Sequence, residues 1–93
     1  MDSQFYFTKC YFSGHVQGVG FRYQAVSIAK GFELTGYVKN MSDGRVELLA
    51  EGEETEVINF LEVIESELDA FIKNTEKETG SRPKQYTNFS IIA

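Results

Sequence analysis

A glycine-rich segment at residues 14–20 offers the clearest chemistry in the sequence. Gly14, Gly18 and Gly20 leave three points of this segment free of side chains, so several backbone N–H groups can turn inward and form a nest for an anion. The helix expected to follow adds unpaired N–H groups and the positive end of its dipole. Arg22 lies in the first turn of that helix, and its planar guanidinium suits paired contacts with phosphate oxygens. The segment therefore predicts a phosphate site.

Glycine spacing alone is equally compatible with a plain tight turn. Two nucleotide motifs are absent from this segment. A P-loop would end in Lys followed by Ser or Thr, and a dinucleotide fingerprint would carry a further glycine at position 23, where the sequence has Tyr23. The segment therefore gives no indication of a nucleotide.

Asn40 is the second polar residue of interest, and it lies where a predicted strand reaches a hairpin. Residues 40–44 (Asn-Met-Ser-Asp-Gly) contain the Asp-Gly pair that is a strong hairpin signal. Asn is itself a common turn residue, so Asn40 taken alone is better explained by turn formation than by chemistry.

The elements that must position these residues follow from hydrophobic periodicity. We expect strands at residues 5–13, 34–39, 46–51, 70–75 and 86–92, and helices at residues 21–30 and 53–66. The polar residues 76–85, with Gly80 and the only proline, are expected to form a loop. In the first strand, Thr8, Cys10 and Phe12 should share one face.

This order, β-α-β-β-α-β with a short terminal strand, predicts an α+β protein of the ferredoxin-like type, the split βαβ sandwich. Its antiparallel sheet carries both helices on one face, and residues 1–93 form a single domain. Many functions use this architecture, so the fold does not decide the activity.

Two segments resemble the signatures of one family, the acylphosphatases. Residues 14–22 (Gly-His-Val-Gln-Gly-Val-Gly-Phe-Arg) resemble the first signature, and residues 36–46, followed by Gly52, resemble the second. The resemblance is strongest over about residues 12–52 and in the closing strand. Many members carry a Gly-Pro stretch where this chain has Glu-Ser-Glu-Leu-Asp at residues 65–69, which leaves the end of the second helix and the register of the fourth strand open.

The family hydrolyses the carboxyl–phosphate anhydride of acyl phosphates. The resemblance implies that Arg22 and the backbone amides of the turn bind the phosphoryl group, while Asn40 positions the attacking water. The amides concerned are those of His15, Val16, Gln17, Gly18, Val19 and Gly20. Gln17 is expected to shape the turn, and the His15 side chain either adds attraction for phosphate or, as we favour, points outward.

The chemistry fits such a spare site. The leaving carboxylate has a conjugate acid of pKa about 4, so it departs without a proton and no general acid is needed. Phosphoryl transfer needs positioning and charge stabilisation. Asn40 cannot act as a base, but it can orient water. We expect no cofactor and no metal, since one His and one Cys cannot assemble a Cys/His metal site.

The charge balance of −5 argues against nucleic acid as a partner. The one cysteine can form no internal disulfide. No stretch approaches the ~20 apolar residues of a membrane span, so a cytoplasmic protein is expected. We also expect a monomer, and we expect inorganic phosphate or sulfate to compete for the anion site. The main alternative is a non-catalytic phosphate-binding regulatory domain, which would not need Asn40. An RNA-binding module is disfavoured because the third strand offers Glu47, Leu49 and Glu51 outward. A segment of a larger carbamoyl-transfer maturation protein is disfavoured by the length of the chain.

Overall fold

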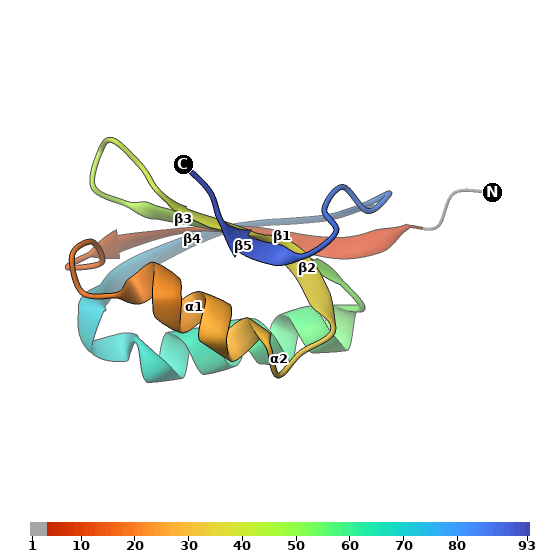
Figure 1. The fold of residues 1–93 in the computed structure, drawn as a ribbon, viewed down its shortest axis with the longest axis horizontal. Helices are drawn as coiled ribbons and strands as arrows, with labels where there is room; N and C mark the ends of the chain where they lie inside the picture. The colour runs from red at the N-terminus through yellow and green to blue at the C-terminus, as the bar shows by residue number, and fades with distance from the viewer. Residues whose placement is uncertain (1–3) are drawn as a thin grey trace.

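The computed structural model describes residues 4–93, and its strands and helices follow the predicted order. Two helices lie on one face of a five-stranded sheet of order β4-β1-β3-β2-β5 (Figure 1). The elements are β1 (Phe5–Gly14), α1 (Phe21–Ala29), β2 (Leu34–Asn40), β3 (Val46–Gly52), α2 (Glu54–Glu67), the short 3-10 helix η1 (Asp69–Phe71), β4 (Ile72–Arg82) and β5 (Phe89–Ile91). The ferredoxin-like prediction is confirmed.

The predicted antiparallel pairing holds for the four long strands, where β1 pairs with β3 and β4, and β2 pairs with β3. The short β5 instead runs parallel to β2, so the complete sheet is mixed. Among residues 4–93, no helix is long and apolar enough to span a membrane.

The predictions of a strand at 70–75 and a loop at 76–85 are only partly right, because residues 72–75 are in a strand and 83–85 are not, but both boundaries are wrong. Residues 70–71 belong to η1, and β4 continues through residue 82 in register with β1. The sequence of β4 resembles that of a loop because β4 lies at the edge of the sheet, where polar residues face water. Gly80 is not a turn signal either. It lies opposite Phe7, and a Cβ at Gly80 would approach the Phe7 ring to 2.7 Å.

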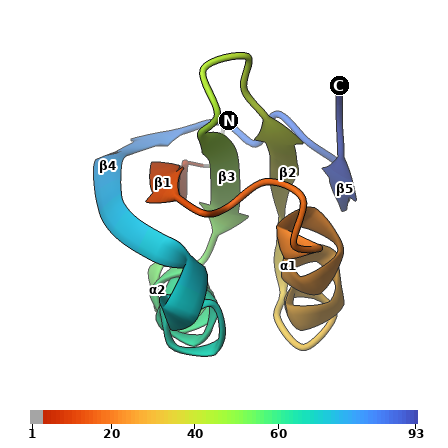
Figure 2. The same cartoon turned by 90° about the vertical axis from the view of Figure 1, so that its left-hand side faces the viewer.

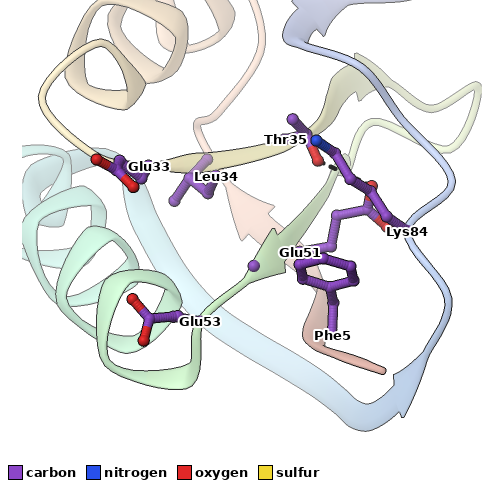
Figure 3. Close-up of a pocket in the computed structure, with 8 residues that line it drawn as sticks. Phe5, Glu33, Leu34, Thr35, Glu51, Glu53 and Lys84 are labelled. Carbon is purple, nitrogen blue, oxygen red and sulfur yellow. Dashed lines mark hydrogen bonds between the residues drawn. The ribbon is translucent and has the colours of Figure 1, made fainter. Parts of the chain in front are cut away.

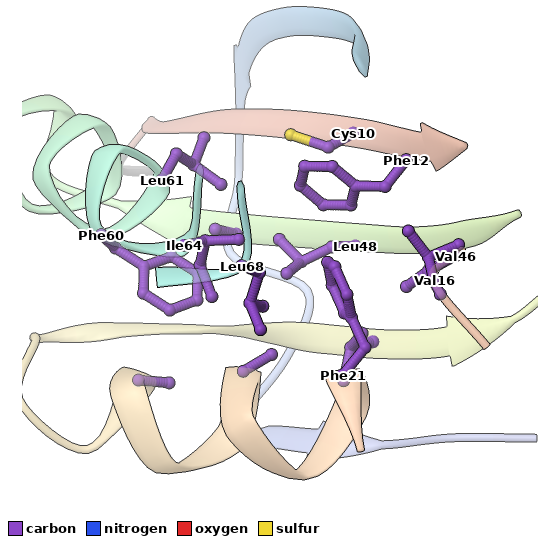
Figure 4. Packing of buried hydrophobic residues seen from close by; sticks show 14 of the residues in the cluster. Cys10, Phe12, Val16, Phe21, Val46, Leu48, Phe60, Leu61, Ile64 and Leu68 are labelled. Atoms are coloured by element: carbon purple, nitrogen blue, oxygen red, sulfur yellow. The ribbon is translucent and has the colours of Figure 1, made fainter. Parts of the chain in front are cut away.

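The core fills the space between the sheet and the helices (Figure 4). Thr8, Cys10 and Phe12 share one face of β1, as predicted, and all three are buried. Phe12 packs on Phe21 of α1 with ring centroids 5.2 Å apart. The apolar face of α2 is buried over the same sheet and comprises Val57, Phe60, Leu61 and Ile64. The first turn of α1 is therefore anchored by an aromatic contact with the sheet.

The opposite face of β3 is covered, which corrects the prediction that it is open. Glu47, Leu49 and Glu51 are only 8%, 1% and 1% exposed. The cover is the segment at residues 83–88, because Glu51 accepts hydrogen bonds from the backbone N–H groups of Gln85 (3.1 Å) and Tyr86 (2.7 Å). A carboxylate that is buried with donors is satisfied, so these glutamates do not form an acidic surface.

Candidate active site

The glycine-rich turn begins at a tightly fixed point. The His15 N–H donates to the carbonyl of Phe71 at 2.9 Å, and the Val16 side chain is 1% exposed in the core. Gly14 has φ +129°, and a Cβ there would lie 2.5 Å from the same carbonyl oxygen of Phe71, so only glycine fits. The His15 amide is thus already engaged, which removes it from the predicted set of phosphate donors and leaves the amides of residues 16–20.

The rest of the turn exposes backbone donors. Gly18 and Gly20 both have φ +79°, in the left-handed region that favours glycine. The N–H groups of residues 16–20 donate to no carbonyl or side chain within the described residues 4–93. Gly20 precedes α1 without a side-chain cap, and the first turn of α1 carries no acidic residue. The turn therefore offers unpaired backbone donors directly before the positive end of the α1 dipole.

Arg22 and Asn40, the two predicted catalytic residues, line the same cavity of about 210 Å³. One comes from the first turn of α1 and the other from the last residue of β2. Figures 1 and 2 show the glycine turn and the β2–β3 connection at the same end of the sheet. The remaining lining residues are Val16, Gly18, Gly20, Phe21 and Tyr23. Arg22 takes part in neither of the ion pairs found within residues 4–93, so its guanidinium is available to an anion.

Gln17 connects the turn to the β2–β3 hairpin, a contact that the sequence did not reveal. Its side-chain N–H₂ group donates to the carbonyls of Met41 (2.9 Å) and Arg45 (3.0 Å). Met41 follows Asn40 directly, so this double contact fixes the glycine turn relative to Asn40. Gln17 therefore shapes the turn, as predicted, and also positions it. His15 and Val19 do not line the cavity, and His15 is exposed.

Asp43 is a turn residue, as predicted. Its carboxylate accepts from the backbone N–H of Arg45 at 3.1 Å and from the guanidinium Nε of Arg45 at 2.9 Å. These contacts, the backbone one first, hold the pKa of Asp43 below its usual value. The Arg45 guanidinium also lies 4.8 Å from the centroid of the Tyr11 ring. Arg45 is thus occupied by its neighbours, in contrast to Arg22.

A second cavity of about 340 Å³ lies where β1 and β2 begin and β3 ends (Figure 3). None of the predicted site residues lines it. Its walls include Glu33, Glu51 and Glu53 with one lysine, Lys84, a charge balance that disfavours phosphate. Within residues 4–93, no group of three or more His, Cys, Asp and Glu side chains is arranged to hold a metal ion.

The fold and the 210 Å³ cavity define a class of protein, a ferredoxin-like domain whose first βα turn presents backbone donors beside an arginine and an asparagine. The sequence profile of one family, acylphosphatase, matches residues 8–91. An acylphosphatase of Bacillus subtilis strain 168 is 51% identical over 81 residues, which cover 85% of this chain and 88% of that protein. The chain therefore belongs to the acylphosphatase family, whose members are hydrolases of small-molecule acyl phosphates.

Solved structures agree with this assignment. An acylphosphatase from Coxiella burnetii superposes with a TM-score of 0.79 at 30% identity, covering 96% of this chain and 94% of that one. Full-length HypF, in its phosphate- and nucleotide-bound form, matches with a TM-score of 0.76 at 28% identity. The match covers all of this chain but 12% of HypF, so the same domain also occurs as a small part of a longer protein.

Proposed function

We propose that this protein hydrolyses acyl phosphates without a metal ion, with Arg22 and the amides of residues 16–20 holding the phosphoryl group and Asn40 positioning the water. One observation carries the proposal: Arg22 and Asn40, from different elements, line one cavity together with Gly18 and Gly20 of the turn.

The phosphoryl oxygens accept hydrogen bonds from the turn and from the N-terminus of α1. Charge spreads over the three equatorial oxygens in the transition state, and donors fixed in advance stabilise that charge without reorganising. The Arg22 guanidinium adds a full positive charge and two parallel donors. The buried ring of Phe21, 2% exposed, holds the first turn of α1 and hence the backbone of Arg22 in place.

The Asn40 side chain carries both an acceptor oxygen and an N–H₂ donor, so it can hold a water molecule in a fixed orientation. The water oxygen forms a bond to phosphorus while the bond from phosphorus to the bridging oxygen breaks, and the electron pair of that bond leaves with the carboxylate. The carboxylate needs no proton, because its conjugate acid has a pKa of about 4. The proton of the water passes to a phosphoryl oxygen, which yields inorganic phosphate.

Hydrolysis of benzoyl phosphate in excess EDTA tests the reaction. The wild type should turn over under these conditions, and Arg22→Gln should lose most of its affinity for inorganic phosphate. Lys30→Gln removes an equal charge just after the same helix, at an exposed position, and should bind phosphate as the wild type does. Equal phosphate affinity in wild type and Arg22→Gln would remove Arg22 from the site.

Asn40→Ala separates hydrolysis from binding. Loss of one positioned group should lower kcat by about 10²-fold or more, while the inhibition constant of inorganic phosphate stays the same. Asn59→Ala changes an exposed asparagine on α2 and should leave both values unchanged. A folded wild type that binds phosphate without hydrolysing benzoyl phosphate would instead favour the non-catalytic anion-binding domain.

We further propose that inorganic phosphate and sulfate inhibit competitively and that the protein acts as a cytoplasmic monomer. The unpaired donors of the turn suit either anion. Cys10, the one cysteine, is free and buried, so its thiol is not available to form a disulfide with a second copy of the chain. Light scattering that gave a dimer mass would contradict the monomer.

A further inference from the structure

Tyr23 is an exposed aromatic residue in the first turn of α1. Successive residues of a helix point about 100° apart, so the turn that buries Phe21 directs Tyr23 away from the core. Tyr23 is 72% exposed, the most exposed large hydrophobic side chain within residues 4–93. Single exposed rings are common on proteins, so exposure alone assigns no role to it.

The position of Tyr23 is more informative than its exposure. It lines the same cavity as Arg22 and Asn40. The other exposed large hydrophobic side chains within residues 4–93, Ile58 (39%) and Ile92 (37%), line no part of that cavity. Tyr23 follows Arg22 directly in the chain, and both residues line the cavity that is proposed to hold the phosphoryl group.

The size of the cavity determines where the rest of the substrate must go. A volume of about 210 Å³ is below the range of about 300–1,000 Å³ that encloses a larger ligand. It corresponds to roughly seven waters at ~30 Å³ each, enough for a phosphoryl group, the attacking water and the carbonyl. The acyl carbon is joined to phosphorus through a single bridging oxygen. A larger acyl group does not fit in that volume together with the phosphoryl group and must extend toward solvent. Tyr23 is the one exposed side chain among the residues that line the cavity.

We propose that Tyr23 is a specificity-determining residue that packs against the acyl group, and that aromatic acyl phosphates are preferred over small aliphatic ones for this reason. The inference rests on the proposed function and adds the acyl half of the substrate to it. Aromatic rings pair favourably in offset or edge-to-face arrangements. A tyrosine side chain gives up few rotamers on binding.

The test compares kcat/KM for benzoyl phosphate and acetyl phosphate in four proteins: wild type, Tyr23→Ala, Tyr23→Phe and Ile58→Ala. Tyr23→Ala should lower the benzoyl-to-acetyl ratio by about two- to thirteenfold, the factor expected from one aromatic pair. Tyr23→Phe keeps the ring and should retain the wild-type ratio. Ile58→Ala truncates an exposed apolar side chain on α2 and should leave the ratio unchanged. Inorganic phosphate has no acyl group, so its inhibition constant should be equal in all four.

The possible failures are distinguishable. If the wild type hydrolyses both substrates and Tyr23→Ala leaves their ratio unchanged, Tyr23 does not contact the acyl group and only this inference is overturned. An equal fall in kcat/KM for both substrates, with weaker phosphate inhibition, overturns it too, because that result assigns Tyr23 to the phosphoryl half. If folded wild type hydrolyses neither substrate, the proposed function fails and takes this inference with it.

Discussion

The link between the glycine turn and the β2–β3 hairpin gives a sharp prediction for Gln17→Ala. The substitution removes two hydrogen bonds, to the carbonyls of Met41 and Arg45. Neither carbonyl is left unpaired, because the Arg45 carbonyl still accepts from the Met41 N–H (2.8 Å) and the Met41 carbonyl from the Gly44 N–H (3.1 Å). The cost is therefore two net hydrogen bonds, together about 1–3 kcal/mol.

For a domain of this size, each kcal/mol corresponds to about 4–8 °C in Tm, so thermal unfolding should show a fall of at least about 4 °C. Loss of the link also frees the turn to shift relative to Asn40. A small misplacement of a reacting group can lower the rate by about 10²-fold, so kcat for benzoyl phosphate should fall as well. Gln17→Glu has the same shape but no donor toward the two carbonyls, and it should be at least as damaging.

Gln24→Ala is the matched control, because Gln24 is exposed on α1 and its side chain makes no hydrogen bond within residues 4–93. Its Tm and kcat should stay close to those of the wild type. If Gln17→Ala and Gln24→Ala gave the same Tm and the same kcat, the link would have no role in stability or in positioning Asn40, and the reasoning would be refuted.

Three further predictions concern single positions. Gly20→Ala should lower the free energy of unfolding by about 1–2 kcal/mol in urea titration, the cost of placing an L side chain at a left-handed backbone position. The φ of Gly20 is +79°, and a Cβ there would meet nothing within 4 Å, so no clash adds to this cost. Gly31 has no positive φ, so Gly31→Ala should not lower the free energy of unfolding in this way. Glu51→Gln should lower the free energy of unfolding by about 2 kcal/mol, because a hydrogen bond to a charged acceptor contributes about 1.5–3 kcal/mol. Glu62 is exposed, so Glu62→Gln should leave the free energy of unfolding nearly unchanged in the same titration. Burial raises the pKa of Cys10 from 9.0 to about 12. As the pH rises, the thiol therefore loses its proton in the unfolded chain before it does so in the folded protein. The contribution of Cys10 to the free energy of unfolding is thus fully present below pH 9 and is lost as the pH rises toward about 12. The decline should be shallower in Cys10→Ala, and an equal slope in both proteins would contradict it.

Periodicity predicted the elements that bury one face. Val57, Phe60 and Ile64 are buried on α2 as their spacing requires, and Phe12 is buried on β1. Periodicity failed for β4, because an edge strand that faces water carries little apolar signal. It also could not show that residues 83–88 cover Glu51, since alternation tells which face a side chain takes and not what lies over that face.

The residues proposed for the site could be named from the sequence where they belong to contiguous signatures, and their roles stay predictions. Arg22 and Asn40 were both identified and line one cavity. The engagement of the His15 amide by Phe71 and the contact of Gln17 with Met41 and Arg45 were not predictable. Each joins segments that are distant in the chain, so each depends on the tertiary structure.

The interior place of β1 in the sheet has a consequence for synthesis of the chain. β1 (Phe5–Gly14) lies between β3 and β4, so the strand of this sheet that is synthesised first pairs on one side with the strand that ends at Arg82. Until that strand emerges, the aromatic β1 has an unpaired edge, which is a hazard for association with other chains. Native pairing of β1 is therefore completed only after the residues up to Arg82 have been synthesised, and closing so long a loop slows folding.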